Sequence, residues 1–463
     1  MGNEYLVLSD MHLADVEDHD DGWKIYKSSR FLFDDEFSDI LDHFVKRNKP
    51  GSRLTLVLNG DVFDFDLVTA VPEDAPWPVN LSERRRGLHS TEEKSIWKLE
   101  RMLDDHPGFV EALAVFLSKG HKLVYLMGNH DREFHYPGVQ DTLRQRIIKR
   151  AEELGGSFED DAITFEPWFY LVPGEIYVEH GQQYDHYTSF RNLLSPVVKH
   201  QDEERLALPM GNLSNRYLMS KMGFFNPHAS DYILNLFSYL AHWLKYYALS
   251  PRSLMFNWLW GSLVVIGKLL RIRKKLLGRS RDKTERLEEV AERNSLSLQT
   301  VRKLSGLQRQ PITTRFFRII REFWIDRLLM AIVMTGGTIT LALVAVPLWV
   351  KLMVPLTGFP MIYFIYERFA QGENIFTIEK RFPEVARSIS ELVPVKVVTF
   401  GHTHVPRMIP LSREVSFVDT GTWAPITSPK APDRPVPGYR NYLLASFPDD
   451  QPHSLTFDSW MKK

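Results

Sequence analysis

Five short polar motifs constrain this sequence most strongly, because each follows an apolar run and together they extend over most of the chain. The runs at 5–8, 54–58 and 123–127 are rich in Val and Leu, and a polar turn ends each one. This pattern predicts buried strands whose ends carry functional side chains. The five motifs are Asp10-Met11-His12, Gly60-Asp61-Val62-Phe63-Asp64, Gly128-Asn129-His130-Asp131, His180-Gly181 and Gly401-His402-Thr403-His404.

Amphipathic stretches separate the runs, as at 31–46 and 108–117, so strands and helices alternate along the first part of the chain. Further strand-like runs occur over 163–181 and resume after Glu391. This order predicts an α/β fold in which helices cover a sheet. The polar motifs then lie where strands end and loops begin, which is where such folds place their sites.

Composition excludes some partners and ligands. The 463 residues include 57 Lys and Arg against 58 Asp and Glu, a formal net charge of −1, and no cysteine. Because there is no global basic field, we expect no nucleic-acid partner. Without thiolates, any metal ion must be held by nitrogen and oxygen ligands. A strand-like run that starts at Tyr5 leaves no room for a signal peptide, which predicts a cytoplasmic protein.

The motif residues are of the kinds that hold a pair of metal ions. Two divalent cations about 3.5–4 Å apart need a shared anionic bridge and several further ligands. Asp61 is the natural bridge, because the glycine before it allows a tight turn. In an extended segment, alternation places Asp10 and His12 on one side, and it does the same for His402 and His404. One such motif alone would more often be structural, but five together predict one two-metal site.

In their order, the motifs resemble those of the calcineurin-like metallophosphoesterase family, over roughly residues 4–190 and 392–447. The resemblance implies an α/β (α+β) fold, a two-sheet β-sandwich flanked by helices with ligands on loops at one rim. It also implies two divalent metal ions, one held by Asp10, His12 and His404, the other by Asn129, His180 and His402, with Asp61 bridging them.

The resemblance assigns His130 to the phosphate, as general acid or transition-state donor, with Asp131 orienting it. A hydroxide that bridges the two cations would attack phosphorus in line with the leaving group, without a covalent intermediate. Asp64 would orient a ligand or a loop. The mixed donor set suits Mn, Fe or Zn, and we favour Mn.

The composition changes between the two matching parts. We therefore predict a catalytic domain over 1–199 and 392–463, interrupted by a largely helical insertion over 200–391. Since ligand motifs on both sides of the insertion must share one site, the chain must return to the side of any membrane that it leaves.

Part of the insertion is long and apolar. Residues 328–350 carry no charge, and after Lys351 none occurs over 352–366. Because ~20 apolar residues span a bilayer, we predict a hairpin across 328–366, next to the basic run at 268–281, at the cytoplasmic face of the inner membrane. The alternative is a buried core helix or a homodimer interface.

A membrane-bound insertion predicts a phosphorylated lipid or small molecule as the substrate. The chain is somewhat similar to the UDP-2,3-diacylglucosamine hydrolases, which act on a membrane-borne pyrophosphate, although those enzymes carry Arg where His130 stands and have a smaller insertion. We expect Asn129, His130 and Arg132 to contact the phosphate. Arg85 and Arg86 could clamp it as well, or they could belong to an exposed helix start.

Two other functions are compatible with the sequence. One is a soluble phosphodiesterase, or a protein or nucleotide phosphatase, whose insertion is a dimerising cap. The other is a non-catalytic scaffold, which the retention of every candidate ligand disfavours.

Overall fold

The computed structural model describes residues 2–20, 23–47, 53–200, 203–221, 223, 244, 254–277, 284–323, 325–370, 375–428, 431–449 and 451–460. Arg279 and Arg281 of the predicted basic run lie outside these residues.

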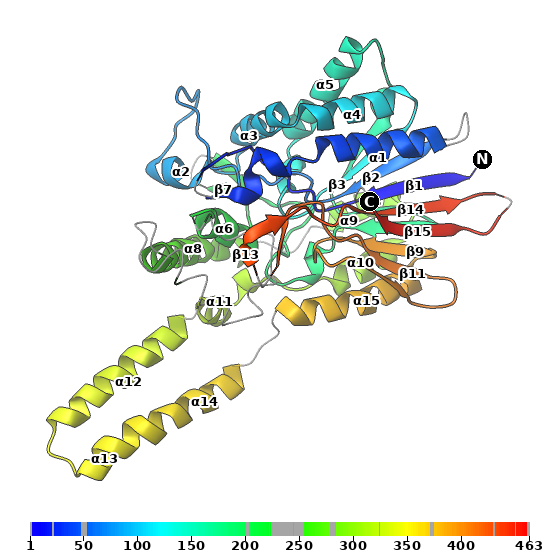
Figure 1. The fold of residues 1–463 in the computed structure, drawn as a ribbon. Coiled ribbons are helices and arrows are strands. Elements are labelled where there is room, and N and C mark those ends of the chain that lie inside the picture. Colours follow the sequence, from blue (N-terminus) through cyan, green and yellow to red (C-terminus); the bar gives the residue numbers. More distant parts are fainter. Residues whose placement is uncertain are drawn as a thin grey trace.

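Two β-sheets form the centre of the molecule (Figure 1). The larger has the strand order β15-β14-β1-β2-β3-β4, and the smaller has the order β10-β11-β9-β6-β5. The strands of the larger sheet are β1 (Asn3–Leu8), β2 (Leu54–Asn59), β3 (Lys122–Leu126), β4 (Ile163–Glu166), β14 (Asn441–Phe447) and β15 (Ser454–Ser459). Those of the smaller sheet are β5 (Phe169–Val172), β6 (Ile176–Glu179), β9 (Val397–Phe400), β10 (Arg407–Pro410) and β11 (Ser416–Asp419).

The two sheets pack face to face. Val7 and Val57 of the larger sheet share one apolar cluster with Val178 and Val397 of the smaller sheet. Helices α1 (Asp34–Arg47), α3 (Glu92–Asp105), α4 (Pro107–Ser118) and α5 (Pro137–Glu153) cover the outer face of the larger sheet. Helices α9 (Thr284–Arg293), α10 (Leu298–Leu307) and α15 (Ile375–Leu392) cover the outer face of the smaller sheet. The predicted α/β sandwich flanked by helices is therefore confirmed.

Parallel pairing places the functional loops at one rim. β1 pairs with β2 and β2 with β3 in parallel, with Val7 opposite Val57 and Val57 opposite Val124. In the smaller sheet β6 and β9 are also parallel. The carboxyl ends of parallel strands lie at the same edge of a sheet. Each of these five strands is followed at once by one of the five motifs.

Most of the insertion packs on this body. Leu213 of α6 (Met210–Tyr217), Val265 of α8 (Leu254–Leu277) and Ile319 of α11 (Phe316–Glu322) belong to the same core cluster as α1 and α3. Val301 of α10 and Phe382 of α15 belong to the cluster beneath the smaller sheet. The domain limits at 199 and 391 stay a prediction, but these helices are part of the catalytic core.

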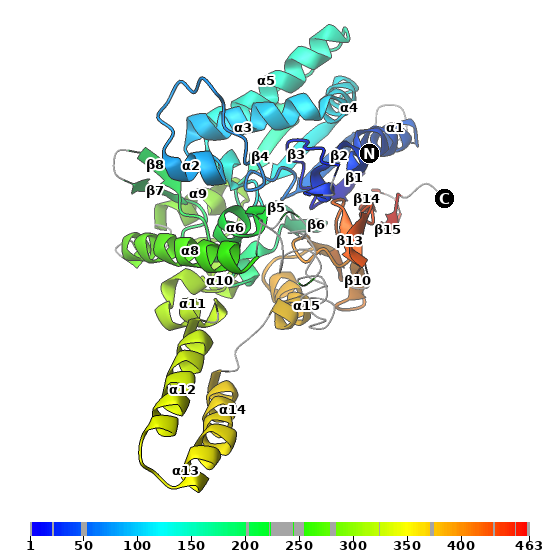
Figure 2. The same cartoon turned by 60° about the vertical axis from the view of Figure 1, so that its left-hand side comes forward.

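Residues 325–370 form an arm that projects from the body (Figures 1 and 2). Its elements are α12 (Ile325–Leu343), α13 (Leu348–Met353), a π-helix (Val354–Gly358) and α14 (Phe359–Ala370). The uncharged run 328–350 is not one helix, because it turns at 344–347 before α13. By length and composition alone, the helical stretches Ile325–Leu343 and Leu348–Phe369 could each cross a bilayer.

Polar contacts fasten both ends of this arm. At its base, the Nε of Arg327 donates to Glu367 at 2.6 Å, and the Tyr366 hydroxyl donates to Asp326. At its tip, the Lys351 ammonium donates to the carbonyl of Ala342 at 2.9 Å. The two helical segments of the arm, α12 and α13–α14, are therefore joined at both ends and form an antiparallel hairpin.

Candidate metal centre

The loops after β1, β2, β3, β6 and β9 are bonded to one another at the rim of the sandwich. The amide of His12 donates to the Asp61 carbonyl at 2.9 Å, and the amide of His130 donates to the Asp61 carboxylate at 2.7 Å. The amide of Gly401 donates to the His180 carbonyl at 3.0 Å. Segments far apart in the sequence thus hold each other in place.

Among the described residues, four groups of three His and Asp side chains have ligand atoms within 4.8 Å of one another. Two of these groups contain only predicted metal ligands. The first comprises Asp10, His12 and His404, and the second comprises Asp61, His180 and His402. The Asp61 carboxylate also lies 3.9 Å from the Nε2 of His12, which links the two groups. The structure therefore brings six of the seven predicted ligands together, and the place of Asn129 among them stays a prediction.

Asn129 provides a test of whether these residues suit metal ions. Its side chain is buried, and neither its amide nitrogen nor its amide oxygen has a hydrogen-bond partner among the residues that the structure describes. A buried polar group without a partner is costly in free energy. A metal ion bound through the amide oxygen would remove the part of that cost that is due to the oxygen. The residues present therefore fit a metal ion.

The backbone of five predicted ligands adopts the left-handed conformation. Their φ angles are 53° at Asp10, 49° at His12, 52° at Asp61, 71° at His402 and 60° at His404. Non-glycine residues rarely adopt such angles, and they cluster at functional sites. The expectation that alternation in extended segments pairs the ligands was therefore wrong. Sharp turns aim these side chains at the centre instead.

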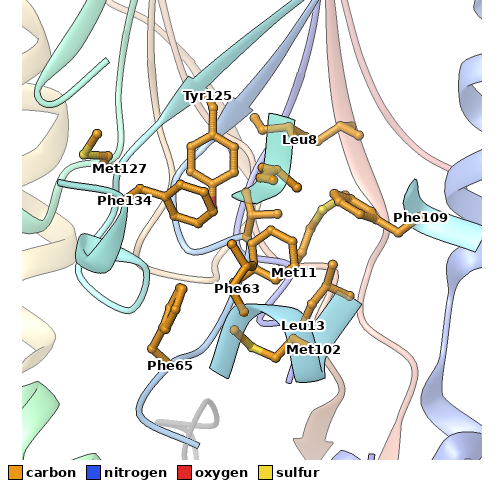
Figure 3. Close-up of a cluster of buried hydrophobic side chains, with 14 of the residues drawn as sticks. Leu8, Met11, Leu13, Phe63, Phe65, Met102, Phe109, Tyr125, Met127 and Phe134 are labelled. Atoms are coloured by element: carbon orange, nitrogen blue, oxygen red, sulfur yellow. The ribbon is translucent and has the colours of Figure 1, made fainter. Parts of the chain in front are cut away.

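Apolar residues between the ligands anchor the turns. Met11, Leu13 and Phe63 point into a buried cluster with Tyr125 and Phe134, as Figure 3 shows. In these motifs the polar residues lie at the rim and the apolar residues are buried in the core. Packing of the apolar residues thus fixes the positions of the adjacent ligands.

Two motif glycines are required by close approach. A Cβ on Gly128 would lie 2.2 Å from the Asp61 carboxylate oxygen, and one on Gly60 would lie 2.6 Å from the His180 ring. Gly60 also has a φ of +74°. The glycines therefore make the space into which the ligands fit.

His130 is held by carboxylates of the loop after β2. Its Nδ1 lies 3.1 Å from the Oδ2 of Asp64 and 3.5 Å from the Oδ2 of Asp66. The Nδ1 of His12 lies 3.2 Å from the same Asp64 oxygen. Burial lowers the pKa of His130, but Asp64 and Asp61 outweigh it and hold that pKa well above its ordinary value.

Asp131 bonds the backbone of two loops and a tyrosine, and its predicted role in orienting His130 stays a prediction. Its carboxylate accepts hydrogen bonds from the amides of Gly128 at 2.6 Å and Val62 at 2.9 Å, and from the Tyr125 hydroxyl at 2.7 Å. It therefore ties the loop after β3 to the loop after β2. Burial raises its pKa to about 6.

Opposite charges shift the other pKa values. Burial raises the pKa of Asp61, but His180 and His130 lower it further, so it lies well below its ordinary value. Burial lowers the pKa of His180, but Asp61 and Asp10 raise it to about 10. Burial lowers the pKa of His12.

Sequence reasoning missed several residues that complete the site. Asn212 of α6 donates to Asp66 at 2.6 Å and to the carbonyl of Asn129 at 2.8 Å. The Nε2 of His402 lies 3.2 Å from Asp185 and 3.1 Å from the Thr188 hydroxyl. Asp66 extends the alternation that begins at Asp64, so it could have been found, whereas the others lie in no motif.

The three arginines predicted to contact the phosphate bond other parts of the protein or are exposed, and their contact with a phosphate stays a prediction. The guanidinium of Arg132 is buried and donates to the carbonyls of Pro167, at 2.7 Å, and Leu193. Arg86 donates to the Tyr217 carbonyl at 2.6 Å. Arg85 is exposed on the short helix α2 (Leu81–Arg86). The alternative of an exposed helix start was wrong in part, because Arg85 and Arg86 lie in the last turn of α2 and Arg86 is half-buried. Arg132 bonds the backbone of two other segments.

Comparison with known proteins identified one family. The profile described as calcineurin-like phosphoesterase matches residues 4–216. The match extends past the predicted limit at 199 and includes α6, which bears Asn212. A search of curated proteins found no match.

Proposed function

Over residues 4–216 the chain belongs to the calcineurin-like phosphoesterase family, and we propose that it hydrolyses a phosphoester or pyrophosphate bond of a lipid at a membrane surface. Membership of that family makes it a metal-dependent hydrolase of phosphoester bonds. The observation that carries this activity is the pair of His and Asp groups that meet at Asp61. The lipid and the membrane are our inference from the projecting hairpin.

The residues of the centre have separate tasks. Asp10, His12 and His404 would hold one ion, Asn129, His180 and His402 the other, and Asp61 both. When bound, the two ions supply Lewis acidity to the phosphoryl oxygens and lower the pKa of a coordinated water. Mn remains our preference, because the donors are imidazole, carboxylate and amide groups.

His130 is the group placed to act on the substrate. Its side chain keeps 14% of its surface exposed, whereas those of Asp61 and His180 are almost fully buried. Asp64 and Asp61 favour the protonated form of this ring, and a protonated ring would stabilise charge on the phosphoryl oxygens. Because Nδ1 faces Asp64, the proton that reaches the leaving oxygen is the one on Nε2.

Exposed apolar surface supports the membrane proposal. None of the described side chains of α12 and α13 is buried, and Val333, Leu343 and Trp349 are each about 70% exposed or more. At ~1.5 Å per residue, 19 and 22 residues give lengths of about 30 Å, the thickness of a bilayer core. Such a surface is otherwise unfavourable in water.

Charge and aromatic placement support an orientation. Ionised side chains lie at the base, where Arg327 and Glu367 pair, and Lys351 lies at the tip. Phe317 on α11 is 81% exposed and Trp260 on α8 is 56% exposed, as interfacial aromatics are. Arginine next to a membrane span favours the cytoplasmic side. We therefore place the base of the arm and the catalytic body on the cytoplasmic side of the membrane.

A hairpin deletion tests this proposal. Replacing residues 328–366 by a short Gly-Ser linker keeps Arg327 and Glu367, which already touch across the base. We expect the full chain to sediment with membranes and to need detergent for release. The deletion variant should stay in the supernatant and should still hydrolyse bis-p-nitrophenyl phosphate with Mn.

The substrate is tested with the same two proteins. The full chain should hydrolyse a lipid phosphate or lipid pyrophosphate in vesicles far faster than the deletion variant does, while both hydrolyse the soluble diester equally. If the full chain is soluble without detergent and forms a dimer that the deletion dissociates, the membrane proposal is wrong. The soluble phosphatase with a dimerising cap then takes its place.

A further inference from the structure

A second site candidate lies one helix away from the metal centre. A cavity of about 80 Å³ opens between the hairpin of β7 (Val197–His200) and β8 (Glu203–Leu206), helix α6 and helix α8. The two helices lie side by side in both views (Figures 1 and 2). Asn212 of α6 reaches the metal centre, whereas Leu213 and Tyr217 of the same helix line the cavity.

Part of the cavity wall is apolar. Val198 and Leu206 of the β-hairpin face Leu208 and Leu213, and all four side chains are almost fully buried in the protein. Apolar walls of this kind favour a hydrocarbon group over water. The volume takes a short length of chain or a compact head group, so a longer ligand would extend out of the mouth.

The rest of the wall is cationic. Arg205, Arg216, Lys268 and Arg271 line the cavity, and no carboxylate occurs among the described residues that line it. Arg205 donates to Glu203 at 2.8 Å, and Arg216 interacts electrostatically with Asp66 and Glu133. Lys268 and Arg271 are the two lining cations for which no ion pair is seen among the described residues. The ammonium of Lys268 lies 4.2 Å from the centre of the Tyr217 ring. Gathered cations next to apolar walls select an anion that also carries a hydrocarbon part.

Two buried polar side chains of the wall, His89 and Arg216, each have a nitrogen without a hydrogen bond, although His89 Nδ1 lies 3.3 Å from Glu83 and Arg216 donates to the Gly87 carbonyl at 3.4 Å. His89 is 7% exposed and Arg216 is 1% exposed. The Nε2 of His89 and the Nε of Arg216 form no hydrogen bond within the part of the chain that the structure describes. Such groups cost free energy unless a ligand satisfies them. This observation is independent of the charge pattern, and it points to the same kind of ligand.

We propose that this cavity binds an amphipathic anion, a molecule with an acidic head and a single apolar chain. Arg216, Lys268 and Arg271 hold the head, and the leucines contact the first part of the chain. The cavity is separate from the metal centre, where the bond is hydrolysed. The proposal therefore does not depend on the proposed substrate. A membrane lipid and a soluble alkyl phosphate share this chemistry.

Photolabelling tests the proposal without relying on turnover. Full-length protein in a neutral detergent, freed of metal, is irradiated with a dodecyl phosphate that carries a diazirine near its head. We expect labelled peptides from β8 and α6. Unlabelled dodecyl phosphate should compete, whereas dodecanol and inorganic phosphate should not. Competition by inorganic phosphate at equal concentration would reduce the cavity to a simple anion site and overturn the proposal.

Matched charge variants localise the head. The double variant Lys268→Gln and Arg271→Gln should weaken labelling by about tenfold or more, since charge-assisted bonds are lost. The control variant Arg302→Gln and Lys303→Gln removes the same two residue types from the exposed face of α10 and should label like wild type. Equal labelling of both double variants would overturn the proposal.

A filled cavity provides a second variant. Val198→Trp on β7 should abolish labelling while metal content and hydrolysis of bis-p-nitrophenyl phosphate stay unchanged. Labelling that survives in this variant would place the ligand elsewhere and overturn the proposal. If wild-type protein is labelled but does not hydrolyse any of the phosphoesters, that result would contradict the proposed function and leave this proposal intact. Supplying the same phosphate within zwitterionic vesicles then decides whether the ligand enters from a bilayer or from solution.

Discussion

Replacing Asp64 by Asn separates the two tasks of this carboxylate. Its Oδ1 accepts the amides of Asp66 and Leu67, both at 3.0 Å, and its Oδ2 lies 3.1 Å from His130 Nδ1 and 3.2 Å from His12 Nδ1. Asn retains an oxygen for the two amides. It places an amide nitrogen, which is a donor, opposite two imidazole nitrogens that also donate.

The expected magnitude follows from those contacts. A charge-assisted hydrogen bond contributes about 1.5–3 kcal/mol, and two are lost while the loop keeps its shape. An outer carboxylate behind a metal-binding imidazole changes metal affinity by roughly 10–100-fold. A positioned general acid contributes about 10²–10⁴ in rate. We therefore expect weaker Mn binding and, at saturating Mn, a kcat lower by at least about 10².

Mn titration of metal-free protein, followed by hydrolysis of bis-p-nitrophenyl phosphate, measures both effects. Asp161→Asn is the matched control, because that side chain is 75% exposed. Adding His130→Ala to Asp64→Asn should cost little further rate if both changes act through His130. Wild-type metal affinity together with wild-type kcat in Asp64→Asn would refute this reasoning.

Three further changes have definite outcomes. His130→Ala should retain two equivalents of metal by elemental analysis but lose most turnover, and an unchanged rate would remove it from the mechanism. Gly128→Ala should lose metal and activity because its Cβ would lie 2.2 Å from the Asp61 carboxylate, whereas Gly306→Ala, with nothing within 4 Å, should behave as wild type. Burial lowers the pKa of His135 to about 4 from an ordinary 6.5. The folded protein therefore binds fewer protons between those values, and its free energy of unfolding should fall as pH drops from about 6.5 to 4. His135→Gln should reduce that fall, as denaturant unfolding at several pH values would reveal; an identical fall would contradict it.

The ligand set could be predicted because each ligand follows an apolar run in the sequence. Parallel strands such as β1 and β2 put their carboxyl ends at one edge, so Asp10 and Asp61 had to come close. The two-sheet arrangement was implied only by family resemblance, since strand runs alone do not determine how sheets stack.

The remaining details depend on backbone geometry and tertiary contact. Sequence adjacency suggested that Asp131 supports His130, whereas tertiary contact places the Asp64 carboxylate 3.1 Å from the His130 ring and bonds Asp131 to the amide of Gly128. The left-handed turns at His402 and His404 could not be predicted from the sequence, because positive φ angles are uncommon for every residue other than glycine, histidine included. Asn212 lies in a helix without a motif, and only the packing of α6 brings it to Asn129.

The pairing of β1 with β14 has a consequence for the order of synthesis. Asn3 lies opposite Phe447, so one edge of β1 stays unpaired until β14 has been synthesised. His402 and His404 also emerge only after the projecting hairpin is complete. A chain that stops early would lack ligands and would expose an open strand edge, which favours aggregation. Nascent chains therefore remain inactive until the hairpin has been made, and hydrolysis cannot begin before the segment that we assign to the membrane has emerged.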